Sequence, residues 1–317
     1  MGKIVTNGQL ATTLLNVQSK FLNDFDSLMA VQGWRDLVTV LPSNTATEQL
    51  AWFGKTPQMA DVTKTKVSIG GASPYSYSLT SRTWQAGISF EREWWEDDKL
   101  GFSGPLIAAL SEEAVANRGR QVFGLLTSGG LAYDGTAFFS DSRTQGDSGT
   151  IDNNIGYTAA SATTLTQAEV SGVVKLAQQT MAAFKDDKGN VQAKYPDTFV
   201  VPVSLYHDFW QGLATANQMG SIAAIPPTPS SGMVMVGGYK LCVNHVSSSA
   251  SVVYALRTMG TIKPFVFLER QTPAVDGITN VNSKEWMIDR EIPYVATDRF
   301  EVGYGDPRDA LKITIST

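Results

Sequence analysis

Apolar residues recur at intervals of three and four in four stretches of the chain, and this period predicts helices. The stretches cover residues 6–30, 103–127, 166–184 and 204–215. Thr166, with Glu169 three residues later, is typical of the capping box that opens a helix. The stretch at residues 103–127 is the longest, and at 1.5 Å per residue its helix would be about 37 Å long. Gly129-Gly130 would end it.

Shorter apolar runs between and after these helices predict strands. They cover residues 37–42, 198–203, 252–256, 264–269, 286–288, 292–295, 300–304 and 311–315. Residues 233–236 and 239–243 flank Gly237-Gly238, which is typical of a hairpin turn. Because helices and non-contiguous strands are interspersed and no internal repeat is visible, we expect an α+β fold.

Residues 52–92 have a different pattern, in which Thr, Ser, Lys and Tyr alternate with scattered apolar residues. Gly70-Gly71 interrupts the alternation and predicts the bend of a two-stranded ribbon. A ribbon with so few apolar residues is marginal in water unless another surface covers it. It ends in the charged run of residues 90–98, which contains the adjacent Trp94 and Trp95 and leads into the longest helix.

Composition narrows the class of protein. The 317 residues carry a net charge of −5, and 43% are hydrophobic while 17% are charged. The charged fraction is below the roughly one quarter of ordinary soluble domains, and the negative balance disfavours a specific DNA-binding protein. Cys242 is the single cysteine, so no disulfide can form within the chain. Without a long apolar run or a signal-peptide core, the chain is expected to be soluble and cytoplasmic.

Few residues could carry catalysis. His207 and His245 are the two histidines, and neither has a Cys or His companion at the spacing of a metal site. The sequence has no nucleophile elbow, Walker loop or dinucleotide-binding glycine pattern. We therefore expect no catalytic, cofactor-binding or metal-binding residues, and no enzymatic activity.

The charged residues around the ribbon have a simpler interpretation than chemistry. The carboxylates between residues 91 and 98 lack the spacing of a cation-binding loop. Negative charge before a helix N-terminus is favourable by a few tenths to about 1 kcal/mol. Lys64, Lys66 and Arg82 on the ribbon fit a solvated face or pairing with acidic groups of a neighbouring chain.

The order of the elements resembles the Hong-Kong-97-type fold of tailed-phage major capsid proteins, and the motifs are similar to those of the Mu-like major head subunit family (gpT-like). The segments that carry the resemblance are spread in order over nearly the whole chain. They are Ile4-Val5-Thr6-Asn7, Trp52-Phe53-Gly54 with Pro57 and Met59, Ile88-Ser89-Phe90-Glu91-Arg92, Glu96-Asp97-Asp98 with Leu100-Gly101, Val122-Phe123-Gly124-Leu125-Leu126, Tyr133-Asp134-Gly135 with Phe138-Phe139, and Lys263-Pro264 with Phe267. Family members tend to carry Asp-x-Asp-His-Pro after the Phe-Phe pair, where this chain has Ser140-Asp141-Ser142-Arg143.

The resemblance implies a bacteriophage major capsid protein whose copies form hexamers and pentamers of an icosahedral shell around double-stranded DNA. It implies an N-terminal arm at residues 1–50 and an extended β-ribbon loop at 51–90. A peripheral domain with the long spine helix would take residues 91–161 and 259–317, and an axial domain residues 162–258. The arm would reach one neighbouring subunit and the ribbon would lie over another.

The implied partners are other copies of the chain, a separate scaffolding protein or protease and a portal, with a decoration protein as a further candidate. DNA would be contacted weakly and without sequence preference, and no membrane is involved. The protein would act in the virion, after assembly in the host bacterial cytoplasm. The candidate inter-subunit contacts are Lys64, Lys66, Arg82, Glu91, Arg92, Glu96, Asp97 and Asp98.

Two alternatives stay open from the sequence. The first keeps the fold and makes the chain the shell of an encapsulin-like nanocompartment with a protein cargo. The second is an α+β hydrolase that uses His207 or His245.

Overall fold

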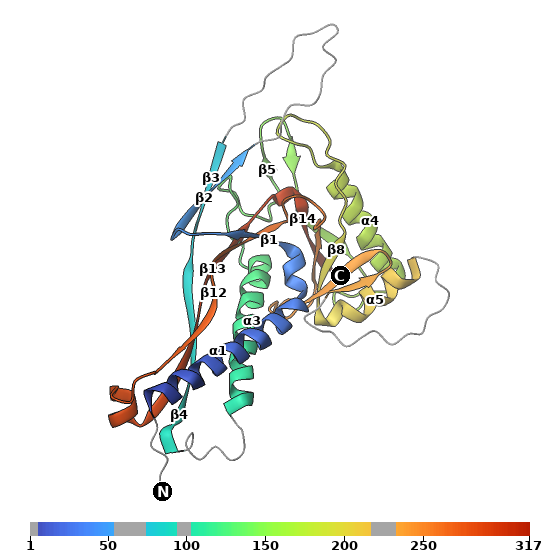
Figure 1. Ribbon diagram of the computed structural model, residues 1–317. Coiled ribbons are helices and arrows are strands. Elements are labelled where there is room, and N and C mark those ends of the chain that lie inside the picture. Colours follow the sequence, from blue (N-terminus) through green and yellow to red (C-terminus); the bar gives the residue numbers. More distant parts are fainter. Residues whose placement is uncertain (1–5, 54–73, 94–102, 217–232) are drawn as a thin grey trace.

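The computed structural model describes residues 6–53, 74–93, 103–216 and 233–317. Two sheets with their covering helices form the body of the molecule, and a β-ribbon lies at one end (Figure 1). Two large hydrophobic cores lie against the sheets, and the first takes in residues of both sheets. Strands from widely separated parts of the sequence meet in both sheets, so neither sheet can be assigned to one continuous segment.

The first sheet has four strands in the order β1 (Val38–Pro42), β12 (Phe265–Gly277), β13 (Glu291–Tyr304) and β4 (Arg82–Glu91). The β1–β12 pairing is parallel, and the other two are antiparallel. Two long helices, α1 (Asn7–Ala30) and α3 (Ser103–Thr127), pack against each other and against this sheet. The short 3-10 helix η1 (Gly33–Leu37) links α1 to β1.

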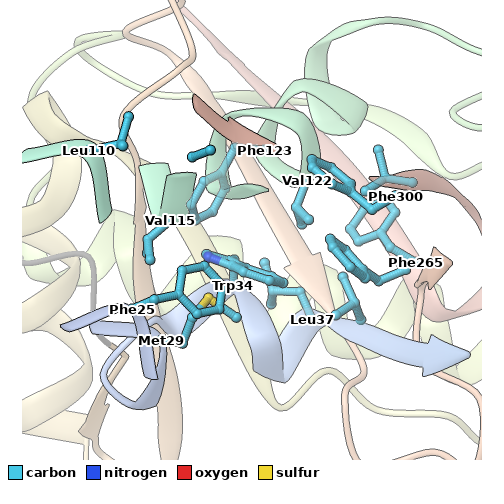
Figure 2. Close-up of a cluster of buried hydrophobic side chains, with 14 of the residues drawn as sticks. Phe25, Met29, Trp34, Leu37, Leu110, Val115, Val122, Phe123, Phe265 and Phe300 are labelled. Atoms are coloured by element: carbon cyan, nitrogen blue, oxygen red, sulfur yellow. The ribbon is translucent and has the colours of Figure 1, made fainter. Parts of the chain in front are cut away.

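Aromatic side chains fill the space between these helices and the sheet. Trp34 stacks on Phe267 with ring centroids 5.4 Å apart, and Phe267 stacks on Phe300 at 5.0 Å. Figure 2 shows Trp34 among side chains of α1 and α3, with Val115 and Phe123 on the α3 side. The N-terminal helix is thus part of the main core, and its Phe21 is fully buried.

The second sheet has six strands, in the order β7, β14, β11, β8, β10 and β9. Their bounds are Asn154–Thr158, Ala310–Ser316, Val252–Leu256, Thr198–Pro202, Tyr239–Asn244 and Val234–Val236. Helices α4 (Gln167–Ala183) and α5 (Val203–Ala216) pack against each other and against this sheet. Their apolar faces complete a core that includes Val170, Phe199 and Phe209.

The remaining elements are short. The ribbon consists of β2 (Thr47–Phe53) and β3 (Pro74–Thr80) in antiparallel register, and β5 (Arg143–Thr144) pairs with β6 (Thr150–Ile151). A π-helical turn, η2 (Glu285–Asp289), lies between β12 and β13. The 3-10 helix η3 (Pro307–Asp309) lies between β13 and β14. None of the helices in the described part of the chain is long and apolar enough to cross a membrane.

All four predicted helices are confirmed, with bounds that differ by at most one or two residues. The capping box at α4 is also confirmed, because the Thr166 hydroxyl accepts the Glu169 N–H while the Glu169 carboxylate accepts the Thr166 N–H. The α+β class and the hairpin around Gly237-Gly238 agree with the sequence as well.

Two expectations about strands were wrong: a strand at residues 286–288, and a break between the strands at 292–295 and 300–304. Residues 286–288 form part of the π-helical turn, because they lie at the reversal between two long strands, where Arg290 takes a left-handed conformation with φ 55°. Residues 292–295 and 300–304 belong to one strand, β13. Buried and half-buried residues alternate along most of β13, and Asp298 occupies one of the buried positions. Because a charged residue stands where an apolar one is expected, the sequence predicts two short strands instead of one.

The ribbon prediction was wrong in its extent. The first strand begins at Thr47, and residues 82–91 leave the ribbon to form β4 in the four-stranded sheet. Trp84, Ile88 and Phe90 alternate with exposed residues on β4 and pack against the first core, so this half of the segment has its own buried face. The predicted bend at Gly70-Gly71 lies outside the described residues.

Candidate functional site

The predicted inter-subunit residues fall into two groups. Lys64, Lys66, Glu96, Asp97 and Asp98 lie outside the described residues, so their contacts stay predictions. Arg82, Glu91 and Arg92 lie on β4 or directly after it. Because β4 runs from the ribbon to the far end of the four-stranded sheet, these three residues are divided between its two ends (Figure 1).

Arg82 lies where the ribbon meets the sheet. Its Nε donates to Glu301 Oε2 on β13 at 2.9 Å, and its side chain is 66% exposed. Burial of the Glu301 carboxyl raises its pKa, while Arg82 opposes this shift. Because the Arg82 side chain is mostly exposed, solvent screening limits the contribution of this pair to about 1 kcal/mol. Arg82 therefore has a partner within its own chain and still presents its charge to solvent.

The base of the ribbon is also attached to its own chain. Leu79 of β3 is buried against Val266 and Leu268 of β12. The Tyr77 hydroxyl accepts the backbone N–H of Tyr304 at 3.4 Å. The strands of the ribbon near the sheet thus need no neighbouring subunit to cover them.

The other end of β4 contacts the turn between β12 and β13. The Arg92 guanidinium lies 4.5 Å from the ring centroid of Trp286, and the Arg92 N–H donates to the Arg290 carbonyl at 2.8 Å. Glu93 forms an ion pair with the Arg290 side chain. These contacts fix the end of β4 to η2, so β4, η2 and the start of β13 form one tip of the molecule.

This tip exposes apolar surface. Met287 and Ile288 of η2 are 62% and 71% exposed, while the adjacent Trp286 is buried. Single exposed apolar residues are ordinary, but two large adjacent ones at the end of a rigid strand pair are typical of a contact surface. We call Met287 and Ile288 the apolar tip.

A buried ion-pair group fixes α3 to the sheet below it. Arg118 donates to both carboxylate oxygens of Asp298, from Nε at 2.8 Å and from Nη2 at 2.9 Å, and its Nη1 donates to Glu269 at 2.8 Å. Its guanidinium also lies within 5.5 Å of the ring centroids of Phe25, Phe267 and Phe300. Burial raises the pKa of the Asp298 carboxyl, and Arg118 opposes that shift.

Sequence reasoning missed this group, although a signal was present. Arg118 occupies the four-residue spacing of the apolar stripe that runs through Leu110, Ala114 and Val122 on α3. A charged residue inside an apolar stripe of a helix needs a buried partner of opposite charge. The sequence alone did not say that the partner would be Asp298, because the two residues lie 180 positions apart.

A second buried charge group lies where the two sheets meet. The Lys194 ammonium is 3.2 Å from Asp306 Oδ2 and 2.7 Å from Asp309 Oδ1. Arg308 Nε lies 2.9 Å from Asp306 Oδ1, and Arg257 Nη1 lies 3.4 Å from Asp309 Oδ1. We call these five residues the junction cluster.

The pKa values of the two carboxyl groups in the junction cluster are shifted in opposite directions. Burial disfavours the charged form of Asp306, but Arg308 and Lys194 outweigh it and lower the pKa of Asp306. Burial and the charge of Asp306 raise the pKa of Asp309. The cluster joins the strand end of β13 to the segment that precedes β8, so it fixes one sheet to the other. The charged run 306–309 between two apolar strands is the sequence signal for it.

The described residues offer no catalytic site. His207 is exposed on α5 and lies 2.9 Å from the Gln211 amide, and His245 is exposed directly after β10. Cys242 is buried, and burial raises the pKa of its thiol to about 12, which suppresses the reactive thiolate. Among the residues with described positions, no group of His, Cys, Asp or Glu could hold a metal ion.

One apolar groove of about 270 Å³ lies between α1, α3 and the segment after β10. Its lining includes Leu28, Trp34, Val115, Phe123 and Val246, with His245 at the rim. Glu112, Arg120 and His245 also line it, but most of its surface is apolar, so the groove has the character of a packing surface.

The chain is similar in sequence to major head proteins of Mu-like phages and prophages. The family model of the Mu-like prophage major head subunit gpT matches residues 10–167 and 234–312. The Mu-like prophage FluMu major head subunit of Haemophilus influenzae is 32% identical over 108 residues, which cover 33% of this chain and 35% of that protein. The major capsid protein of Escherichia phage Mu is 25% identical over 138 residues, 43% of this chain and 44% of that protein. The chain thus spans less than half the length of these curated relatives.

A solved structure extends the likeness to the fold. The procapsid of bacteriophage JBD30 aligns with 94% of this chain and 74% of its own, with a TM-score of 0.52 and 20% identity. This alignment confirms the predicted capsid-protein fold.

Proposed function

The chain belongs to the family of Mu-like prophage major head subunits, gpT, and we propose that it is the major head protein of a tailed bacteriophage. Many copies associate into hexamers and pentamers, and these close into an icosahedral shell around double-stranded DNA. The observation that carries the proposal is the family match, which includes all four strands of the first sheet and both long helices of the first core. The same match favours a phage head over a nanocompartment shell or a hydrolase.

The surface chemistry of the subunit supports a structural task. The apolar tip places Met287 and Ile288 in solvent at the end of two paired strands. Arg82 presents a charge at the base of the ribbon. Both features lie on rigid elements, as a repeated contact between copies requires, because each subunit must present its contacts in the same geometry.

We also propose the division into N-terminal arm, ribbon loop, peripheral domain and axial domain, with the boundaries given by the resemblance. The two hydrophobic cores support a peripheral and an axial unit, since α3, β12 and β13 lie in the first core and α4 and α5 lie in the second. Strand β8 contributes one face to each core. Strands β7 and β14 come from the peripheral segments and pair in the six-stranded sheet. The two units therefore share that sheet, and the junction cluster lies at their boundary.

The proposed partners follow from the proposed role as the major head protein. Other copies of the chain are the main partner, and a separate scaffolding protein or protease, a portal and a decoration protein are further ones. With a net charge of −5, the chain would touch packaged DNA weakly and without sequence preference, because strong binding needs cationic phosphate contacts. The proposed location is the virion, after assembly in the bacterial cytoplasm.

Electron microscopy of the purified protein tests the proposal. The protein is concentrated alone and in the presence of its scaffolding protein, and the fields are scored for closed shells and for isolated capsomers. We expect shells of uniform diameter. Folded monomers that form neither capsomers nor shells under both conditions would contradict the proposed function.

A further inference from the structure

A groove with polar walls lies where helix α1 meets the first sheet. It has a volume of about 500 Å³, and its walls come from the end of α1, from η1 and β1, and from the residues before β12. Its polar side chains are those of Gln32, Arg35, Asp36, Thr39, Thr261 and Lys263. Because two of them are cations and one is an anion, we call it the basic groove.

Hydrogen bonds hold Lys263 at the wall of the basic groove. Its Nζ donates to the Arg35 carbonyl at 3.1 Å, and its backbone N–H donates to Thr39 Oγ1 at 2.9 Å. The Lys263 side chain is partly buried. An ammonium has three N–H donors. Since the described residues accept from one of them, two are available to a ligand in the groove.

The other lining residues add more donors. The Nη1 of Arg35 donates to the Met29 carbonyl at the end of α1 at 3.4 Å, and the Arg35 side chain is exposed. A guanidinium has five N–H donors, of which the described residues use this one. The hydroxyls of Thr39 and Thr261 also line the groove and can donate. A wall so rich in donors suits a ligand that has only acceptors, which is the chemistry of an oxyanion.

The charges of the basic groove do not cancel. Asp36 is the carboxylate among its described lining residues, and Lys240 Nζ pairs with Asp36 Oδ2 at 2.9 Å. Within the described part of the chain, neither Arg35 nor Lys263 forms an ion pair. Burial lowers the pKa of Lys263, and the charges of Lys240 and Arg35 act in the same direction. Asp36 and Asp197 oppose this shift. An anion in the groove would offset the excess of positive charge.

We propose that the basic groove binds a phosphate group of a nucleic acid strand. Arg35 and Lys263 contact the phosphate oxygens, and Thr39 and Thr261 donate further hydrogen bonds to them. The volume of about 500 Å³ is larger than a free phosphate ion needs, so the adjoining sugar fits as well. Val40, whose side chain is 45% exposed, gives the sugar an apolar wall.

The proposed function supplies the nucleic acid, because the shell would enclose double-stranded DNA. The inference rests on that function for the source of the phosphate. A single phosphate contact is weak and independent of base sequence, since every sequence has the same phosphates. The net charge of −5 does not prevent a local contact, because salt screens exposed charges beyond about 10 Å at 0.1 M.

Binding of DNA to the unassembled full-length subunit tests the groove. Fluorescence anisotropy follows a labelled duplex of about 20 base pairs at about 50 mM salt, where phosphate contacts are strong. We expect Lys263→Met to weaken binding about ten-fold. The slope of log affinity against log salt concentration should fall by about 1, because one phosphate contact is lost. Lys175→Met removes an exposed cation from α4 and should bind like the parent chain.

Two further variants keep both cations of the groove. Thr261→Glu adds a carboxylate at an exposed lining residue and should weaken binding about as much as Lys263→Met. Asp36→Asn removes the carboxylate that lines the groove and should tighten binding about three-fold, since like charges repel. A purely structural role of these residues predicts no gain in affinity from Asp36→Asn.

Inorganic phosphate separates the two sources of the phosphate group. It is titrated calorimetrically into the same proteins at matched ionic strength. We expect the parent chain to bind the duplex more tightly than the free ion, because the duplex also brings its sugar to the groove. Binding of inorganic phosphate without binding of the duplex would overturn DNA as the source.

The site itself is overturned if the parent chain binds neither probe. It is also overturned if Lys263→Met and Thr261→Glu, shown to be folded by circular dichroism, bind the duplex as the parent does. Unchanged affinity of Asp36→Asn would count against it in the same way. Closed shells of the parent chain in electron microscopy would leave the proposed function standing after any of these results.

Discussion

Gly119 of α3 lies directly against the indole of Trp34. A β-carbon at Gly119 would be 3.2 Å from Trp34 Cδ1 and 3.4 Å from Trp34 Nε1. Trp34 is buried between α1, α3 and β12, and its far side stacks on Phe267. The glycine therefore sets the distance between the long helix and the first core. A glycine weakens a helix by about 1 kcal/mol relative to alanine, and here the close approach accounts for its presence.

The first prediction compares two glycines of the same helix. Gly119→Leu should lower the free energy of unfolding by about 1–3 kcal/mol, because the side chain would overpack the Trp34 site. Gly124 has open space around its Cα. Gly124→Leu should therefore raise that free energy by about 0.5–1 kcal/mol through helix propensity. Urea unfolding of the unassembled subunit, followed by circular dichroism, measures both. Equal midpoints for the two variants would refute the account of Gly119.

The second prediction concerns the buried ion pairs of α3. Arg118→Met leaves Asp298 buried without its bidentate partner, so it should destabilise the subunit by about 3–5 kcal/mol. Arg120 on the same helix pairs with Glu113, and both side chains are about half exposed. Arg120→Met should change stability by no more than about 1 kcal/mol. If the two methionine variants unfold at the same denaturant concentration, the ion pairs of Arg118 contribute nothing beyond a surface pair.

The third prediction concerns the junction cluster. Lys194→Met removes the cation between Asp306 and Asp309 and leaves two buried carboxylates close together. We expect a loss of about 3–5 kcal/mol. Lys20→Met is the control, because Lys20 pairs with Asp24 on the surface of α1. Differential scanning calorimetry should show a clear fall in melting temperature for Lys194→Met alone. If Lys194→Met and Lys20→Met had equal melting temperatures, the junction cluster would not stabilise the contact between the two sheets.

The fourth prediction concerns unfolding by alkali. Burial raises the pKa of Tyr294 to about 12, above its ordinary value near 10. A group with a raised folded pKa contributes stability that is present below its unfolded pKa and lost as pH rises through the folded value. Tyr294→Phe removes this ionisation, so the variant should lose less stability than the parent between about pH 10 and pH 12. Tyr195→Phe, at an exposed tyrosine, should follow the parent. Parallel pH profiles of all three proteins would show that Tyr294 ionisation plays no part.

The fifth prediction concerns the apolar tip. Ile288→Asp should leave the stability of the subunit within about 0.5 kcal/mol of the parent, because the side chain is 71% exposed. The same change should reduce the yield of shells by at least ten-fold, since it buries a charge in the proposed contact. Met259→Asp introduces the same charge at another exposed apolar position, with 77% exposure, and is the control. Electron microscopy and sedimentation measure the yield. Full assembly of Ile288→Asp would exclude the tip from the contacts between subunits.

The sequence predicted most elements because their signals are local. The helix at residues 103–127 and the capping box of α4 depend on residues within a few positions of one another, and both agree with the structure. The error in β13 has a non-local cause. Asp298 interrupts the apolar alternation, and its partner Arg118 lies on another element far away in the chain. A buried charge cannot be recognised from its own neighbours in sequence.

The candidate site was predictable only in outline. Arg82, Glu91 and Arg92 were chosen because they are charged and close to the ribbon, and the structure places them at opposite ends of one strand. Arg82 and Arg92 have partners within the chain, Glu301 and Trp286, that no spacing could have indicated. The exposure of Met287 and Ile288 was also hidden, because three apolar residues in a row are equally consistent with a buried strand.

Each sheet is completed late in synthesis. Strand β13 is an interior strand of the four-stranded sheet, between β12 and β4. Strand β14 is an interior strand of the six-stranded sheet, between β7 and β11. A ribosome-bound chain that stops before them has two sheets with gaps and cannot close either core. We therefore expect the chain to reach its folded form only after these strands have left the ribosome. If copies assemble as proposed, we expect truncated products to be excluded from the shell, because they lack the folded surfaces of the complete sheets.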